Sequence, residues 1–190
     1  MHVDIKPEPP CFDMQVRQKG LSYLKQEGIP MDKPLAKGVK LETYWRACLD
    51  DLYKSYEGIC AYLCIHLERV TGDASVDHYI AKSQRADLAY EWKNFRLACV
   101  RMNTYKREFE DVLDPFEIEN GWFHLELTSG RIYANPSLSD EIAGKIINTI
   151  RRLRLDEPEF REMRVKRFDA YIMNGISSYH LKKESPLIWH

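Results

Sequence analysis

Five polar side chains between positions 77 and 106 have the types and spacing that phosphodiester hydrolysis needs. They are Asp77, His78, Asn94, Asn103 and Lys106. Carboxylate and amide oxygens suit a hard divalent ion, a histidine can accept a proton from water near neutral pH, and a lysine can contact phosphate. Because only about 30 residues separate the first from the last, bringing them together costs little loop-closure entropy.

Each of these residues also has a plain structural interpretation. A histidine beside an aspartate is often a hydrogen-bonded core residue. Asn94 could be a capping amide and Lys106 a solvated lysine. The chemical interpretation therefore depends on whether the surrounding elements bring the side chains together.

The pattern around them predicts two strands and a helix. Val70 to Ala74 carries a turn signal, residues 75–80 alternate as a strand does, and residues 86–92 indicate a helical turn. A second strand is expected over 93–98 and a helix over 99–109. Since alternation would send Asp77 and His78 to opposite faces, the first strand must end or kink near them to serve one phosphate.

The order Asp-His, then Asn before a short apolar run, then Asn-x-x-Lys resembles the HNH endonuclease family, whose core is a β-hairpin and one helix around a divalent ion. The resemblance implies that Asp77 and Asn103 bind one Mg²⁺ or Mn²⁺ and that His78 activates water. It implies that Asn94 braces the loop holding His78. The residues expected to contact nucleic acid are Lys106, Lys82 and Arg101.

Many members of that family hold the core with a zinc ion bound by two Cys-x-x-Cys pairs. Here Leu63 stands three residues after Cys60 and Met102 three residues after Cys99, where the second cysteine of each pair would lie. A rescued site would need irregular spacing and would use Cys60, Cys64, His66 and Cys99. We therefore expect no structural zinc, with packing of apolar side chains holding the hairpin and the cysteines acting as small buried hydrophobes.

The remaining segments frame this core and predict an α+β fold. Residues 1–40 are rich in proline and glycine and are expected to form an extended arm that either lies across its own domain or docks a partner. Residues 41–110 would form the nuclease core, entered by a scaffold helix over 41–56. Residues 111–190 would add a β-hairpin and an antiparallel pair of helices, packed with the core as one domain.

Both predicted C-terminal helices carry a basic face. The residues are Lys145, Arg151, Arg152 and Arg154 on the first, and Arg161, Arg164, Lys166 and Arg167 on the second. Such a concentration of arginine can grip phosphates. A solvated or partner-binding face, offset by neighbouring acidic residues, is the alternative.

Composition limits how this chain can find a substrate. Its 190 residues have a formal net charge of -1, which does not provide the basic field of a protein that finds nucleic acid unaided. Five cysteines without regular spacing do not indicate a disulfide framework, and no N-terminal apolar run resembles a signal peptide or a membrane span. We expect a cytoplasmic protein that uses a local patch or a partner.

A fuller resemblance runs from Pro10-Cys11-Phe12-Asp13 through Cys60-Ala61-Tyr62 and Asn120-Gly121-Trp122-Phe123 to the end. It is similar to the nuclease subunit of Septu-type antiphage systems, relatives of which accompany retrons. The resemblance implies a DNA substrate, with RNA as the alternative, and an ATPase partner of the ABC-like, SMC-related kind. A retron reverse transcriptase and its DNA are further implied partners. A catalytically silent module that binds nucleic acid or the ATPase is the competing interpretation.

Overall fold

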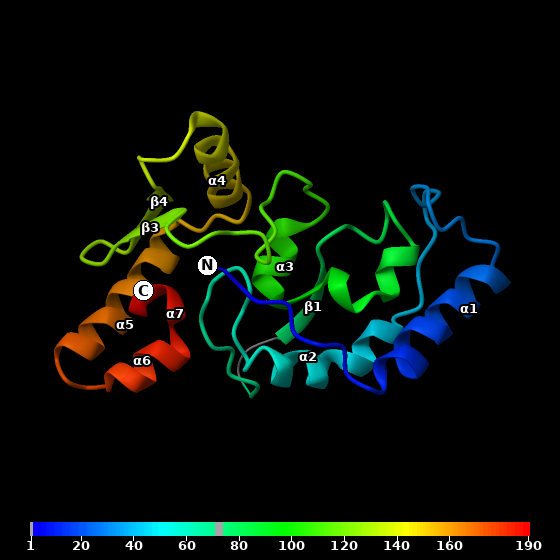
Figure 1. The fold of residues 1–190 in the computed structure, drawn as a ribbon, viewed down its shortest axis with the longest axis horizontal. Coiled ribbons are helices and arrows are strands. Elements are labelled where there is room, and N and C mark those ends of the chain that lie inside the picture. Colours follow the sequence, from blue (N-terminus) through cyan, green and yellow to red (C-terminus); the bar gives the residue numbers. More distant parts are fainter. Residues whose placement is uncertain (1, 71–73) are drawn as a thin grey trace.

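The computed structural model describes residues 2–70 and 74–190, and a small antiparallel sheet with one helix stands at its centre (Figure 1). Strand β1 (Ala74–His78) pairs with β2 (Phe95–Cys99), so that Asp77 lies opposite Arg96. Helix α3 (Val100–Lys106) follows β2 directly and packs against both strands. The predicted strand, strand and helix are therefore present in the predicted order.

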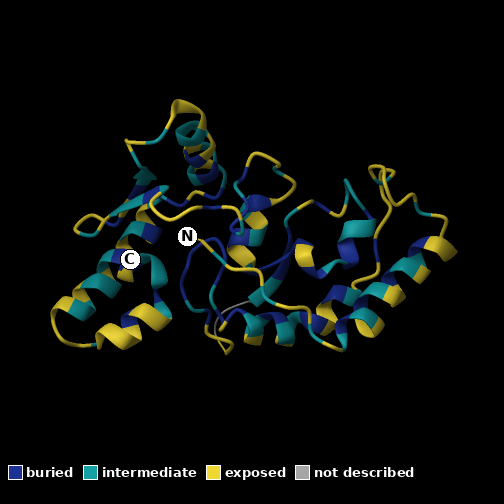
Figure 2. Cartoon of the chain, in the orientation of Figure 1, coloured by how far each residue is buried: buried dark blue, intermediate teal, exposed yellow. Residues whose placement is uncertain are grey.

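The ends of the central elements depend on short turns of 3₁₀ helix. Strand β1 ends at His78, and η3 (Asp87–Tyr90) and η4 (Trp92–Asn94) lead into β2. Four of the five residues of β2 are buried, which places this strand in the interior (Figure 2). Most of the turn predicted from Val70 to Ala74 lies outside the described residues.

The scaffold before the sheet is shorter than the sequence predicts. It begins as the 3₁₀ helix η2 (Tyr44–Cys48) and continues as α2 (Leu49–Ser55). The following segment, residues 59–68, forms turns rather than a strand. It is tied to the sheet because Ala61 N–H donates to Leu97 O at 2.8 Å, and Ile59 and His66 form one isolated bridge.

The N-terminal segment is not an extended arm. A π-helical turn, η1 (Asp13–Arg17), runs into α1 (Gln18–Gln26), and both pack on the core. Buried apolar side chains on this segment are Phe12, Val16 and Leu24. Further upstream, Val3 N–H donates to Pro115 O at 3.0 Å, and Trp92 Nε1–H donates to Lys6 O at 2.9 Å. Of the two interpretations of this segment, the structure supports packing across its own domain.

The C-terminal part contains the expected hairpin, β3 (Phe123–Glu126) and β4 (Arg131–Ala134), and four helices. These are α4 (Asp140–Arg152), α5 (Pro158–Ile172), α6 (Ser178–Glu184) and α7 (Pro186–Trp189). Ser139 caps the start of α4, because its Oγ accepts from Ile142 N–H.

The predicted antiparallel pairing of the two long C-terminal helices is wrong. Helix α4 packs against β4, while α5 packs against α6 and α7 at one end of the molecule (Figure 1). The hairpin and the short terminal helices supply apolar partners that the pairing argument left out. The C-terminal tail also packs back, with Ile188 buried. Within the described residues, no helix is long and apolar enough to cross a membrane.

Candidate active site

A cleft of about 1330 Å³ opens where the ends of β1 and α3 meet the scaffold helix η2. Asp77, His78 and Asn103 line it together. These three residues come from β1 and α3, and the antiparallel pairing of β1 with β2 brings α3 back beside them. Trp45 forms part of the opposite wall, and its ring meets that of His78 edge-on at 4.7 Å between centroids.

Hydrogen bonding fixes the tautomer of His78. Its Nε2 lies 3.0 Å from Ala89 O, and a carbonyl oxygen can only accept, so Nε2 carries the hydrogen. The other ring nitrogen, Nδ1, therefore keeps its lone pair. Burial, reinforced by Lys82, lowers the pKa of His78 to about 3. The imidazole is thus neutral at neutral pH, which is the form that can accept a proton.

Asp77 is a buried carboxylate held by two neighbours. Tyr62 O–H donates to its Oδ2 at 2.5 Å, and Lys106 Nζ lies 3.9 Å from the same oxygen. Burial raises the pKa of this carboxyl even though Lys106 and Tyr62 oppose the shift. The other oxygen, Oδ1, has no hydrogen-bond partner among the described residues. A cation at Oδ1 would stabilise the charged form.

The two asparagines have distinct geometries. Asn103 Nδ2 donates to Ser75 Oγ and to Val76 O, both at 3.2 Å, which leaves its amide oxygen as the group that can ligate a metal. Asn94 instead ties two loops together. Its Oδ1 accepts from Ile80 N–H at 2.8 Å, and its Nδ2 donates to Ile80 O and Leu88 O. Asn94 therefore braces the segment that follows His78 and does not line the cleft.

Lys106 cannot contact a phosphate as the resemblance implies. Its side chain is 0% exposed, and Nζ donates to His78 O at 3.1 Å and to Tyr79 O at 2.7 Å. Burial lowers the pKa of this amine, and the Asp77 carboxylate opposes the shift. Lys106 thus positions the end of β1 from within the core.

Four exposed cations, from separate segments, line the cleft instead. They are Lys40, Arg46, Lys82 and Arg107. None of them forms an ion pair with any residue the structure describes, although Glu108 also reaches the rim. Of the residues expected to contact nucleic acid, Lys82 lines the cleft. Arg101 points elsewhere and donates to Glu159 at 2.7 Å.

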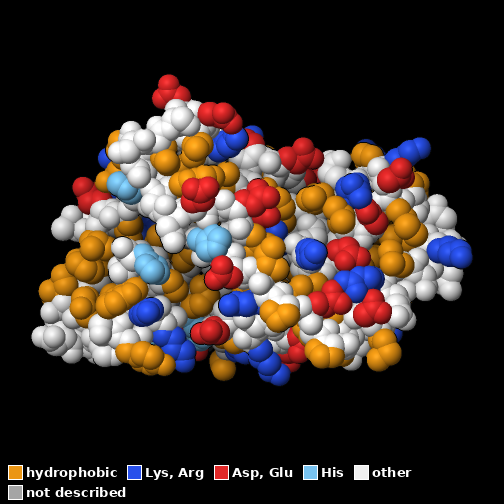
Figure 3. Space-filling view, viewed as in Figure 1, with side chains coloured by type: hydrophobic (Ala, Val, Ile, Leu, Met, Phe, Trp, Pro, Cys, Tyr) orange, Lys and Arg blue, Asp and Glu red, His pale blue; other side chains and the backbone are white. Residues whose placement is uncertain are grey.

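The basic faces of α4 and α5 are largely committed to internal partners. Lys145, Arg152, Arg154, Arg161 and Lys166 pair with acidic side chains. Buried Arg164 donates to Gly130 O and Leu155 O. On the face shown in Figure 3, basic and acidic side chains are interspersed. The alternative in which acidic neighbours offset these residues describes both helices better than a phosphate-gripping patch does.

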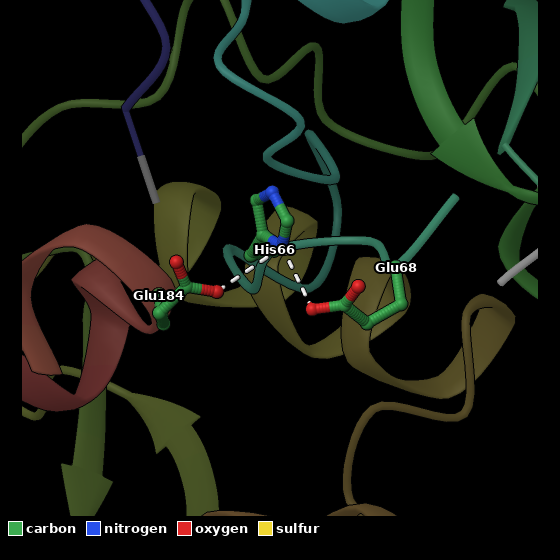
Figure 4. Close-up of side chains that lie close together, drawn as sticks. All are labelled: His66, Glu68 and Glu184. Atoms are coloured by element: carbon green, nitrogen blue, oxygen red, sulfur yellow. Dashed lines mark ion pairs between the residues drawn. The ribbon is translucent and has the colours of Figure 1, made fainter. Parts of the chain in front are cut away.

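The cysteine set of the broken zinc motif does not form a cluster of ligands. Cys60 and Cys64 are buried, and burial raises the pKa of both thiols. Among the described residues, one group of at least three potential metal ligands lies close together. It consists of His66, Glu68 and Glu184 (Figure 4). His66 is thus separated from the cysteines and faces two carboxylates.

The cleft residues fit a hard divalent ion. Within the part of the chain that the structure describes, Asp77 has one carboxylate oxygen and Asn103 an amide oxygen without a hydrogen-bond partner, and both residues line the cleft. Oxygen donors of this kind, completed by water and phosphate, suit Mg²⁺ or Mn²⁺.

Sequence reasoning missed three residues that shape this site. Tyr62 holds Asp77, Trp45 packs on His78, and Arg96 forms a buried bidentate pair with Asp114, with Nε–Oδ1 at 2.8 Å and Nη2–Oδ2 at 2.5 Å. The only available signal was polarity inside an apolar run, as at Arg96 within β2. The partners lie 15 or more positions away along the chain and follow no local spacing. No family model matches this chain, and a search of curated proteins finds no match.

Proposed function

We propose that this protein is a metal-dependent nuclease that hydrolyses phosphodiester bonds in the cleft beside β1. One observation carries the proposal: a neutral histidine lines the same cleft as two oxygen atoms without a hydrogen-bond partner and four cations without an ion pair, counted over the described residues. In a chain with net charge -1, this local concentration of positive charge supports an anionic substrate.

The residues divide the chemistry as follows. His78 accepts a proton from water at Nδ1 while Ala89 O holds the ring through Nε2. Asp77 and Asn103 would hold the divalent ion, and the ion would supply positive charge to the phosphate and the leaving oxygen. Tyr62 and Lys106 keep the Asp77 carboxylate in place. Lys82, Arg46 and Lys40 hold the phosphate backbone on either side of the reacting bond.

We further propose that DNA is the substrate, with RNA as the alternative, and that the chain is the effector subunit of an antiphage complex. The resemblance of the Asp77-His78, Asn94 and Asn103 pattern to the HNH family supports the nucleic-acid substrate. The fuller resemblance, from Pro10-Cys11-Phe12-Asp13 to the end of the sequence, to the nuclease subunit of Septu-type systems supports the antiphage role. The chain has no G-x-x-x-x-G-K-[ST] motif, so nucleotide hydrolysis would belong to an ATPase partner.

Plasmid nicking in Mg²⁺ or Mn²⁺, by the chain alone and together with an ATPase of the proposed kind, tests the proposal. We expect cleavage that EDTA stops. Asp77→Asn keeps an oxygen for Tyr62 but removes the charge, and should lower the rate about 100-fold or more, which corresponds to ~2.7 kcal/mol in the barrier. Asp111→Asn, at an exposed ion pair with Arg152, is the matched control.

An undiminished rate in excess EDTA would refute the metal-dependent mechanism. Retained nucleic-acid binding with no cleavage under any of these conditions would instead identify the chain as a silent binding module.

A further inference from the structure

A second group of potential metal ligands lies away from the cleft, between the 59–68 segment and the end of α6. His66 and Glu68 come from the first segment and Glu184 is the last residue of α6. One ligand atom from each lies within 4.8 Å of the others, and Figure 4 shows the three side chains converging. The backbone joins the same two segments, because His66 N–H donates to Glu184 O at 2.9 Å.

The tautomer of His66 follows from its other ring nitrogen. Tyr53 O–H donates to Leu67 O, so the hydroxyl has no second hydrogen to give, and its oxygen accepts from His66 Nε2–H at 3.1 Å. In the neutral ring, Nδ1 therefore presents a bare lone pair toward two carboxylates. Such an arrangement is unfavourable unless a cation lies between them.

A proton does not satisfy this arrangement well. Nδ1 is buried and has no hydrogen-bond partner, although Glu184 Oε2 is 3.1 Å away. The carboxylate oxygen thus lies near Nδ1 but off the direction in which an N–H would donate. Glu68 Oε1 lies 3.8 Å from the same nitrogen.

A metal ion fits these separations. Tetrahedral zinc with nitrogen and oxygen ligands at about 2.0–2.1 Å places neighbouring ligand atoms about 3.3 Å apart, a value that the two distances at Nδ1 bracket. The bond from Nε2–H to Tyr53 is the outer contact that commonly orients a metal-binding histidine.

The charged groups around the cluster sum to a net negative charge, which favours a cation. Arg167 approaches from α5, but its Nη1 donates to Ser185 Oγ at 2.8 Å and to Glu184 O at 3.4 Å. Arg69 stacks on the Tyr53 ring and pairs with Asp50. One nearby guanidinium, that of Arg167, against two carboxylates leaves a net negative charge when His66 is neutral.

We propose that His66, Glu68 and Glu184 form a second metal site, which takes a borderline transition ion such as Zn²⁺ through one nitrogen and two oxygens, with water completing the shell. The ion clamps α6 to the 59–68 segment. Because this segment also carries Tyr62, the clamp steadies the residue that holds Asp77. The site does not depend on any activity in the cleft.

Calorimetric titration of the metal-free full chain with ZnCl₂ tests the site, carried out in the Asp77→Asn background so that the cleft is weakened as a competing site. We expect one zinc per chain and a higher unfolding midpoint with zinc. Glu184→Gln should lower the affinity at least 10-fold and remove the shift in midpoint. Glu162→Gln is the control, because Glu162 is an exposed glutamate paired with Lys166.

Nitrogen NMR of the His66 ring supplies an independent readout. Zinc should move the Nδ1 resonance while Nε2 stays protonated. The metal site would be overturned if the chain took up no zinc or if Glu184→Gln bound zinc as tightly as the unsubstituted residue. A doubly protonated ring that zinc leaves unchanged would also overturn it and would establish a plain imidazolium ion pair.

Discussion

At the scale of single residues, chemical type was predictable, but environment was not. Asp77, His78 and Asn103 were identified by order and spacing, and they line one cleft. Lys106 was expected at the phosphate, but it is enclosed because two backbone carbonyls, of His78 and Tyr79, accept its hydrogens. Local sequence does not reveal such carbonyls, since their position depends on how α3 packs against β1.

Substituting Arg107 should change the stability of the fold and the binding of nucleic acid in opposite directions. It follows α3 with φ +47° and ψ -125°, a conformation that favours glycine, and it lines the cleft. A strained residue of this kind costs about 1–3 kcal/mol and often persists for a functional reason. Arg107→Gly should therefore raise the free energy of unfolding by about 1 kcal/mol and yet weaken nucleic-acid binding.

Denaturant unfolding and fluorescence anisotropy measure these two effects. Arg107→Ala is the control, because it removes the charge without relieving the backbone. A destabilised glycine variant, or one that binds nucleic acid as tightly as the wild type, would contradict this role.

At the scale of elements, periodicity predicted the sheet, α3 and the C-terminal hairpin. It did not show that the N-terminal segment packs on the core, or that α4 and α5 pack on separate partners. In both cases distant partners decide the outcome. Helix α1 packs against Tyr90, and α4 packs against β4. The prolines and glycines of the N-terminal segment indicate where regular structure is interrupted. They do not indicate which side chains of this segment are buried.

Two helical glycines test this packing. A Cβ at Gly20 in α1 would lie 2.1 Å from Tyr90 Cγ, whereas a Cβ at Gly144 in α4 would meet nothing within 4 Å. Gly20→Ala should therefore destabilise the protein by about 1–3 kcal/mol through overpacking. Gly144→Ala should stabilise it by ~0.5–1 kcal/mol through helix propensity.

The unfolding midpoints of the two variants give the comparison directly. If Gly20→Ala were as stable as the wild type, the N-terminal segment would be detached from the core in solution and again available as a docking arm.

At the scale of the whole molecule, a net charge of -1 conceals where the usable positive charge lies. Five of the eight basic residues predicted on the two C-terminal helices pair with acidic residues, whereas Lys40, Arg46 and Lys82 at the cleft do not pair within the described chain. Sequence counts treat both sets alike, because pairing depends on tertiary geometry. With few free cations, we predict that the isolated chain binds and cuts weakly and that the proposed partner would deliver the nucleic acid.

The salt dependence of DNA binding distinguishes the two sets of cations. Replacing Lys40, Arg46 and Lys82 with alanine should reduce the slope of log K against log[salt] by about 0.9 per lost phosphate contact. The control replaces Lys145, Arg152 and Lys166 with alanine, because these residues of α4 and α5 pair with acidic side chains. Equal losses in both variants would mean that nucleic acid does not bind specifically in the cleft.

The cleavage rate of the His78→Ala variant is the most direct test of whether this cleft is a nuclease centre. The rate is measured with the proposed partner and Mg²⁺, and nucleic-acid binding is measured in parallel. We predict that this variant binds nucleic acid within about twofold of wild type and cleaves it about 10²–10⁴ times more slowly. Added imidazole should partly restore cleavage by filling the vacated space beside Ala89 and Trp45. Cleavage at the wild-type rate in His78→Ala would contradict the assignment of this cleft as a nuclease centre.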